Sequence, residues 1–279
     1  MKWVRAAAVG AMIAVVAVGF LARPIMHSDD ILTRVVAVRA GGGVVPSNLL
    51  RVYVELSAPM EPGGAYEHIH LRDENGREVD GAFLVLREEL WSPDHRRLTL
   101  LFDPGRVKRG IRSNVEMGQP LTDGRRYQLA IDSGWRDANN RPLVAPYTQE
   151  LRVTGVDSVG PDPRRWSISS PHIGTQESLR VDFGESLDHA LATRLITVVD
   201  SLGTNVDGRV LMSVDGRLWS FLPSRAWRAG VRLRVDPALE DLAGNNVIRP
   251  FDRVRARSSV VSDAALTDTT PRLIPLATR

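Results

Sequence analysis

The chain has 279 residues, of which 43% are hydrophobic and 25% charged, so it is long enough for two domains that each bury a core. It contains no cysteine, which excludes disulfides, thiolate metal sites and a cysteine nucleophile. The formal net charge is only +3, and no basic cluster is interleaved with aromatic residues, so we expect no nucleic-acid partner.

The first 22 residues have the pattern of an export signal. Lys2 and Arg5 precede an uninterrupted apolar run from Ala6 to Ala22, as in a secretory signal peptide or an uncleaved signal anchor. Small residues at Ala17 and Gly19 suit cleavage after Gly19, but the run is also about as long as the roughly 17–25 residues that span a bilayer. Under both alternatives the rest of the chain is extracytoplasmic: periplasmic, membrane-anchored through this segment, or secreted.

Short strands separated by turn residues follow a linker that we place at residues 23–47. The stretch LLRVYVELSAPM, residues 49–60, alternates apolar and polar residues with the period of a half-buried strand. Farther along, Ile69 and Leu71 share one face of the next strand. No stretch after residue 22 shows a capped helical period, so residues 48–155 are predicted to form a β-sandwich.

Residues 163–257 repeat the same order of strands and turns. Leu179-Arg180-Val181 matches Leu50-Arg51-Val52, and the polar turn in LEDLAGNN matches the one in WRDANN. The second stretch is therefore predicted to be a second copy of the same domain. The first copy is expected to be longer through two insertions, residues 89–96 and 106–123. Residues 258–279, rich in Ser, Thr and Pro, are expected to be a poorly ordered tail.

Three patterns carry a resemblance to a known family. The strand LRVYVELSAPM, the segment RRLTLLFDPGRVKRG and the two turns with Asp, Ala and Asn resemble the bacterial immunoglobulin-like domains of the surface-layer type, over roughly residues 48–257. This resemblance implies an all-β fold of two tandem immunoglobulin-like sandwiches after an N-terminal signal or anchor helix. It also implies use outside the cytoplasm as a spacer or binding module, and it implies no catalytic residues.

Two groups of residues could hold a metal ion. His68 and His70 project from one face if both lie on a strand, and could then share Zn²⁺ or Cu²⁺; alternatively both face solvent while their neighbours fill the core. The acidic residues of the recurring turns are Asp132, Asp137, Asp236 and Asp241. Their oxygens suit Ca²⁺, but Asp is also a residue that turns require, so the repeat explains them without a metal. No other cofactor is expected.

A binding surface is predicted beside the first insertion. Its members are Glu88, Glu89, Trp91, Asp94 and His95. Carboxylates beside an aromatic platform are what a glycan site uses, and loops on a rigid sandwich often carry specificity. As a glycosidase pair the two glutamates fail, because adjacent residues on a strand point to opposite faces.

The sequence therefore predicts a non-enzymatic cell-envelope protein that binds or spaces, with an envelope protein or glycan as its partner. No catalytic residue is assigned, because neither a serine nucleophile elbow nor a phosphate-binding loop is present. The alternative is a carbohydrate-active or metal-dependent enzyme, or its accessory domain, with the first domain's insertions forming the site.

Overall fold

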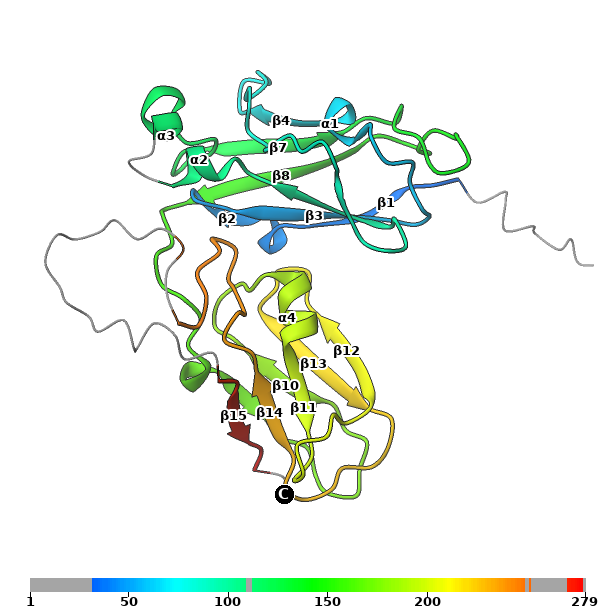
Figure 1. Ribbon diagram of the computed structural model, residues 1–279, viewed down its shortest axis with the longest axis vertical. Helices are drawn as coiled ribbons and strands as arrows, with labels where there is room; N and C mark the ends of the chain where they lie inside the picture. Colours follow the sequence, from blue (N-terminus) through cyan, green and yellow to red (C-terminus); the bar gives the residue numbers. More distant parts are fainter. Residues whose placement is uncertain (1–31, 109–111, 249–250, 252–269, 278–279) are drawn as a thin grey trace, which may run out of the picture. The chain divides into compact units, whose positions relative to one another are not determined.

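The computed structural model describes residues 32–108, 112–248, 251 and 270–277 (Figure 1). The expected signal or anchor helix and its cleavage site lie outside these residues. Residues 32–279 belong to one compact unit. In the part of the chain that the structure describes, no helix is long and apolar enough to cross a membrane.

The first sandwich consists of two four-stranded sheets. In spatial order they are β1 (Val35–Arg39), β3 (Arg51–Leu56), β6 (Arg97–Leu101) and β5 (Leu90–Trp91), and β2 (Val44–Pro46), β8 (Tyr147–Thr154), β7 (Arg126–Ile131) and β4 (Ile69–Asp73). All neighbours are antiparallel except β2 and β8, which are parallel. This is the order of immunoglobulin strands A-B-E-D in one sheet and C-F-G in the other, with β2 added beside strand G.

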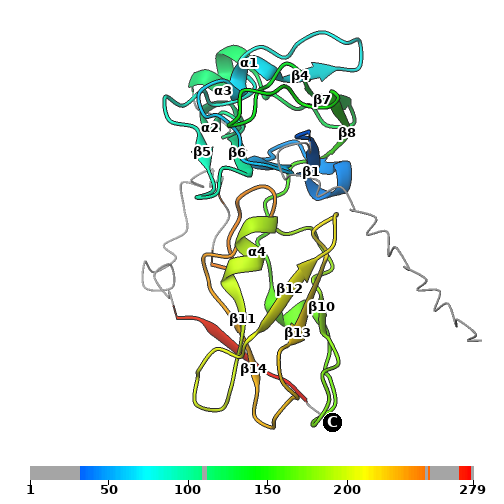
Figure 2. The ribbon, with the colours of Figure 1, turned by 90° about the vertical axis from the view of Figure 1, so that its right-hand side faces the viewer.

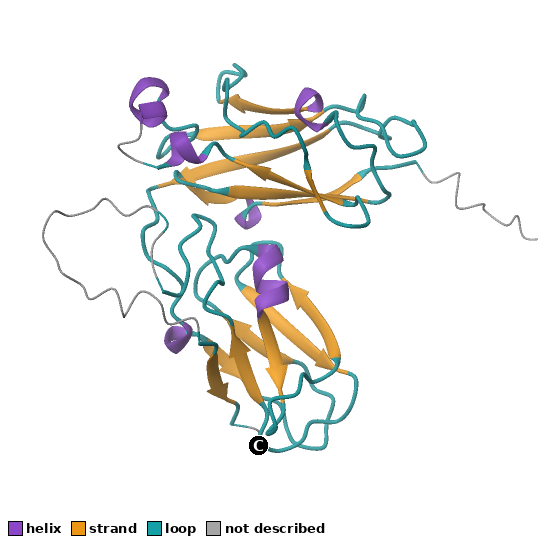
Figure 3. Ribbon diagram, viewed as in Figure 1, coloured by secondary structure: helices purple, strands orange, loops and turns teal. Residues whose placement is uncertain are grey.

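The second sandwich repeats that order. Its sheets are β12 (Gly208–Met212), β13 (Leu218–Pro223), β10 (Leu179–Asp182) and β9 (Ser167–Ser169), and β11 (Ile196–Val199), β14 (Arg232–Val235) and β15 (Arg272–Pro275). These are again strands D-E-B-A and C-F-G. The strand pairing confirms the predicted fold class, an all-β chain with two tandem immunoglobulin-like sandwiches, and strands dominate the view in Figure 3.

The helical segments are short and lie in connections. They are α1 (Ala65–His68), α2 (Pro104–Val107), α3 (Arg112–Met117) and α4 (His189–Leu195), with single 3₁₀ turns η2 (Gly41–Gly43) and η3 (Pro163–Arg165). Helices α1 and α4 occupy the same place in the two copies, between strands B and C (Figure 2). Their equivalence is a further sign of the repeat.

Each sandwich has its own hydrophobic core, because the period of two in its strands sends alternate side chains inward. Val52 and Val54 are fully buried in the first core, as are Leu179 and Val181 in the second. Burying such a side chain stabilises a domain by about 1.5–3 kcal/mol. Four tryptophans are at least nine-tenths buried: Trp135, Trp166, Trp219 and Trp227.

The boundary of the first domain differs from the expected one. Part of the expected linker, residues 23–47, is strand: β1 pairs with β3, and β2 pairs with β8. The three glycines between these strands, Gly41–Gly43, form η2, and all three have positive φ. A Cβ on Gly43 would lie 2.8 Å from the carbonyl oxygen of Glu150, so only glycine allows the two strands to turn this closely.

The end of the second domain also differs. The tail expected at residues 258–279 contributes β15, which pairs with β14 and supplies strand G. The four residues of β15 are too few to produce a recognisable alternation, so the sequence pattern alone could not reveal the strand.

The stretch 89–96 is not an insertion. It contains the turn between strands D and E, and the second copy has the same turn. Ser92 donates to Asp94, and the Ser92 hydroxyl accepts from the Arg97 N–H, as Ser213 donates to Asp215 and accepts from Leu218. The shared pattern of Ser, one residue and Asp is too short to stand out in an alignment by eye.

The second expected insertion, residues 106–123, holds α2 and α3 and is fastened by Arg106. The Arg106 side chain is buried, and its guanidinium donates to the carbonyl oxygens of Asp80, Gly81, Met117 and Gly118. These four bonds satisfy a buried cation without a carboxylate, since each carbonyl contributes a partial negative charge. Arg106 is thus a structural clamp.

Candidate functional site at the junction of the sandwiches

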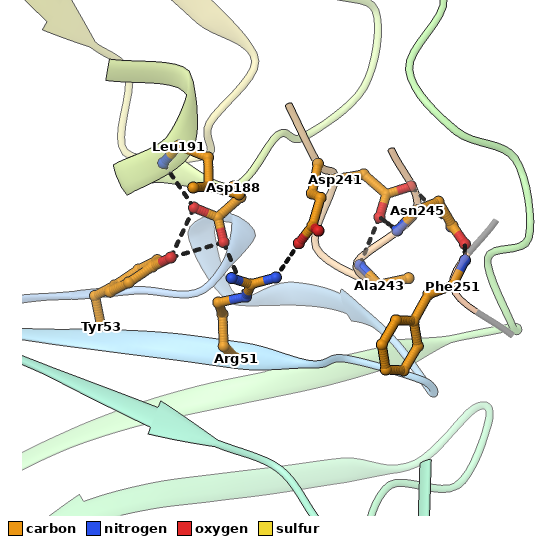
Figure 4. Close-up of polar contacts among 9 residues, drawn as sticks. Arg51, Tyr53, Asp188, Leu191, Asp241, Ala243, Asn245 and Phe251 are labelled. Atoms are coloured by element: carbon orange, nitrogen blue, oxygen red, sulfur yellow. Dashed lines mark hydrogen bonds and ion pairs between the residues drawn. The ribbon is translucent and has the colours of Figure 1, made fainter. Parts of the chain in front are cut away.

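The two sandwiches meet through a buried polar network. Alternation in β3 places Arg51 and Tyr53 on the outer face of the first sandwich, and both point toward Asp188 of the second sandwich (Figure 4). The Tyr53 hydroxyl lies 2.7 Å from both carboxylate oxygens of Asp188, and the Arg51 Nε lies 3.3 Å from one of them. Arg51 also forms an ion pair with Glu240. Because of this contact with the second sandwich, Tyr53 is only 5% exposed although it lies on the outer face of the first.

Asp188 both caps α4 and pairs with Arg51 across the junction. It is the N-cap of α4, where its side chain accepts from the Leu191 N–H at 2.9 Å. Its charge is almost completely buried and is compensated by Arg51. Burial, followed by the negative charge of Asp188, raises the pKa of Tyr53, so the phenol stays protonated and remains a donor.

A second contact joins Asp157, in the chain between the two sandwiches, to the first sandwich. The side-chain amide of Asn48 donates to the carbonyl oxygen of Asp157 at 2.6 Å, and its oxygen accepts from the Asp157 N–H at 2.9 Å. Nearby the Leu50 N–H donates to the Leu242 carbonyl oxygen at 3.0 Å. The Leu242 side chain packs into the core of the first sandwich although the residue belongs to the second. Backbone, side-chain and apolar contacts therefore all cross the junction.

His189, the first residue of α4, lies beside the first sandwich. Its Nε2 is 3.8 Å from a Glu55 oxygen, and its Nδ1 is buried without a hydrogen-bond partner in the described part of the chain. Glu55 is itself paired with Arg39 at 2.8 Å. Burial, and then the charge of Arg39, lower the pKa of His189, so the ring is neutral at pH 7.

The recurring polar turn fastens the incoming chain in each copy. In the first copy Asp137 is fully buried, and its carboxylate accepts from the Thr33 hydroxyl at 2.8 Å and from the backbone N–H groups of Asn139 and Arg141. Burial opposes its ionisation, but these donors outweigh burial, so the pKa of Asp137 is lowered. The turn thus ties the start of the first sandwich to its F–G connection.

In the second copy Asp241 takes the same position. Its carboxylate accepts from the N–H groups of Ala243 and Asn245 and from the Asn245 side-chain amide. That amide also donates to the carbonyl oxygen of Asp157, where the chain enters the second sandwich. Isolated bridges from Met60 to Asp137 and from Leu187 to Asp241 mark the equivalence.

Three carboxylates gather at this second turn. Oxygen atoms of Asp157, Glu185 and Asp241 lie within 4.8 Å of one another, the one such group of three metal-ligand side chains among the described residues. Burial, and then the charge of Asp157, raise the pKa of Glu185 to about 7. Burial also raises the pKa of Asp241 to about 8, against the bonds from Asn245. The cluster can therefore hold protons near neutral pH. Two of its members, Asp157 and Glu185, line a cavity of about 390 Å³ together with Arg217.

The expected calcium ligands do not converge. Asp132 is about half exposed, with its carboxylate 3.2 Å from the His70 ring, and Asp236 accepts from the N–H of Ala238 in its own turn. Of the four expected residues, Asp241 joins a carboxylate cluster, and its partners there were not singled out from the sequence. Calcium binding at these turns stays a prediction, to be checked by thermal unfolding with and without added Ca²⁺.

The two histidines do not share a strand. His68 ends α1 and His70 lies on β4, which begins at Ile69, so the expected same-face geometry does not arise. Both ring nitrogens of His70 already face carboxylates, Glu78 at 2.9 Å and Asp132 at 3.2 Å. The hydrogen bond to Glu78 is the main reason why the pKa of His70 is raised. Zn²⁺ or Cu²⁺ would have to displace these partners.

Most residues of the expected binding surface already have contacts inside the first sandwich. Glu89 accepts from the N–H groups of Gly63 and Ala65 and from the Trp91 indole. The ring of Trp91 packs against the rings of Trp135 and His95, with distances between ring centroids of 5.8 Å and 6.2 Å. Glu88 is exposed.

One member of that set borders a groove. Asp94 lines an open groove of about 500 Å³ together with Arg96, Arg97 and Val36. Its carboxylate already accepts from the Ser92 hydroxyl, which lowers its pKa. The groove thus has a different composition from the cluster that the sequence suggested.

Sequence reasoning missed the junction residues. Asp188 followed by His-Ala-Leu-Ala is an N-cap signal that could have located α4. Tyr53 between Arg51 and Glu55 is an aromatic residue on a polar face, which is a weak sign of an outer contact. Asn48 and Asp157 carried no signal, because their roles depend on which surfaces meet.

Comparisons with known proteins add little beyond the fold. No protein-family model matches the chain, and no curated protein matches it. Among solved structures, Escherichia coli alpha-2-macroglobulin spanning domains MG0-NIE-MG1 is similar at 13% identity over 74% of this chain and 67% of that chain, with a TM-score of 0.29. Domains 1–6 of the surface-layer protein SbsC match at 13% identity over 74% of this chain, with a TM-score of 0.32.

The tandem immunoglobulin domains A164-A165 of titin match at 10% identity over 69% of this chain and 83% of that chain, with a TM-score of 0.21. The chain spans only about a quarter of the SbsC structure, 24%. At these scores the class of protein rests on the strand pairing itself. The order A-B-E-D and C-F-G in both copies defines a tandem immunoglobulin-like protein.

Proposed function

We propose that this chain is an exported, non-enzymatic protein of the cell envelope, in which two immunoglobulin-like sandwiches form a stiff spacer. The observation that carries the proposal is the buried junction of Tyr53, Arg51 and Asp188, with the paired bonds between Asn48 and Asp157. A flexible tandem would leave these groups in water. Fixed partners of a buried charge instead penalise every arrangement that separates them.

A non-enzymatic role is supported by the state of the candidate groups. Glu89, Asp94 and His70 each already have hydrogen-bond partners within the first sandwich. A catalytic acid or base must come within hydrogen-bond reach of the substrate proton that it transfers. Against the alternative, an enzyme or its accessory domain built on the first copy's insertions, stands the turn within residues 89–96, which the second copy repeats.

Export is supported by the apolar run after Lys2 and Arg5. A spacer at the envelope would present its outer faces to an envelope protein or a glycan. Fusing residues 1–31 to a reporter enzyme that is active only after export tests the location. An inactive fusion in a host that exports a control signal would contradict it.

Stiffness is tested by a distance measurement between spin labels. The chain has no cysteine, so labels can be placed at Val85 and Leu202, which are 71% and 88% exposed and lie in different sandwiches. We expect a narrow distance distribution that broadens in Asn48→Ala and Tyr53→Phe. Tyr147→Phe is the matched control, because its hydroxyl contacts Gln149 within the first sandwich. A broad distribution that the junction variants leave unchanged would rule out a stiff spacer.

A further inference from the structure

The second sandwich is closed by a strand from the C-terminus. Strand β15 pairs with β14 through four residue pairs: Arg232 with Pro275, Leu233 with Ile274, Arg234 with Leu273 and Val235 with Arg272. The equivalent strand of the first sandwich, β8, has eight residues and is paired on both sides, by β7 and β2. In Figure 1, β15 lies beside β14 at the end of the chain. Strand G is thus much less firmly held in the second copy.

Few groups of β15 are buried. Arg272, Leu273 and Pro275 are exposed, and Ile274 is partly buried. Leu276, just beyond the strand, is the main anchor, with 7% exposure. Pro275 has no N–H to donate to a ladder. A short strand with one deeply buried side chain contributes little stability and can detach without unfolding the domain.

The edge of β14 that pairs with β15 can accept a strand. Leu233 and Val235 of β14 are fully buried, and their backbone groups need a strand partner. If β15 left, the backbone groups of β14 that pair with it and the buried site of the Leu276 side chain would both become accessible. An unpaired strand edge readily pairs with another chain.

The connection to β15 is long enough to reach a neighbour. Residues 252–271 separate Phe251 from the strand, and 20 residues span at most about 70 Å. In the first copy, residues 132–146 suffice to join strands F and G. A second copy of the chain carries an identical β15. When this strand replaces the chain's own β15 beside β14, every contact within the sandwich is kept.

We propose that the β14 edge of the second sandwich is a docking site for β15 of a second copy, so that two copies can exchange their C-terminal strands. The strand of the same chain competes with an effective concentration on the order of millimolar. Exchange should therefore rise with protein concentration. This inference does not depend on the proposed spacer function.

Disulfide trapping tests the exchange with the full chain, because the native sequence has no cysteine. Arg234→Cys and Leu273→Cys alter register partners whose side chains share the outer face of the sheet, so the two thiols come within reach when β15 is docked. The two single variants are mixed under reducing conditions at rising concentration, then diluted and oxidised. We expect a cross-linked heterodimer at several times the control yield.

The control pair is Leu211→Cys with Leu273→Cys. Leu211 is 52% exposed on β12, in the other sheet, and reports random collisions. Adding Leu276→Asp to the Leu273→Cys chain should return the heterodimer to the control yield, because it removes the buried anchor.

Two results would overturn the proposal. One is a heterodimer yield equal to the control at every concentration up to millimolar, while Arg234→Cys/Leu273→Cys on one chain forms its internal disulfide. The other is a heterodimer that Leu276→Asp does not diminish, because its contact would then not be the docked strand.

Discussion

The hydroxyl of Tyr53, on strand β3 of the first sandwich, donates to the carboxylate of Asp188, which caps helix α4 of the second sandwich, at 2.7 Å. The two residues are 135 positions apart in the sequence. One buried carboxylate therefore caps α4 and accepts the hydrogen bond across the junction at the same time.

Tyr53→Phe should lower the free energy of unfolding by about 1.5–3 kcal/mol, because it removes a hydrogen bond to a buried charge without changing the packing. Urea denaturation followed by tryptophan fluorescence measures the loss. Tyr147→Phe, whose hydroxyl is partly exposed and bonds to Gln149, should cost less than about 1 kcal/mol. Equal losses of unfolding free energy in the two variants would mean that the hydrogen bond to Asp188 stabilises the protein no more than an ordinary surface hydrogen bond does.

Asp188→Ala should be more costly, by about 3–5 kcal/mol, because it leaves Arg51 without its buried partner and removes the cap of α4. Thermal unfolding by circular dichroism is the measurement. The matched control is Asp182→Ala, since Asp182 is exposed and accepts from the N–H of Gly184, two residues away. A loss for Asp188→Ala no larger than that of the control would show that its charge is not needed at the junction.

Gly216→Ala tests a close approach in the turn between strands D and E. The φ of Gly216 is +74°, and an added Cβ would lie 2.8 Å from the carbonyl oxygen of Leu187. Gly184 has a similar φ of +75° with no atom within 4 Å of the added carbon. Both alanines strain the backbone by about 1 kcal/mol. Only Gly216→Ala should also disturb its neighbour, so it should have the lower melting temperature.

Stability should fall as pH rises from 5 to 9. The pKa of Glu185 is raised to about 7 and that of Asp241 to about 8, so the folded state holds protons that the unfolded state has released above pH 4–5. The stabilisation from these two groups is complete below their unfolded pKa values and is lost as pH rises through 7–8. Melting temperatures across this range measure the slope.

Glu185→Gln should flatten that slope, because a neutral amide replaces the titrating group. Glu88→Gln, at an exposed position, is the control and should leave the slope unchanged. His189 acts in the opposite sense, since its lowered pKa makes protonation unfavourable in the folded state as pH falls below 6.5. A melting temperature that rises from pH 6 to pH 9 would contradict the assignment for Glu185 and Asp241.

The sequence by itself determined the all-β class, the tandem repeat and the core positions. These follow from local signals: the period of two in residues 49–60 sends Val52 and Val54 inward, and turns need Asp, Asn and Gly whatever surrounds them. The equivalence of the turns at Asp137 and Asp241 was visible for the same reason, because both keep the residue types that the turn geometry requires.

Only the tertiary structure decided which polar residues act together. Glu185 and Asp157 became partners of Asp241 because the chain between the two sandwiches and the B–C connection of the second sandwich meet at one turn, and no spacing in the chain encodes that meeting. The same holds for Tyr53 and Asp188, and for β15, whose four residues are too few to show a period. Short strands and surface contacts depend on partners distant in the sequence, and their free energy comes from burial that exists only after the chain has folded.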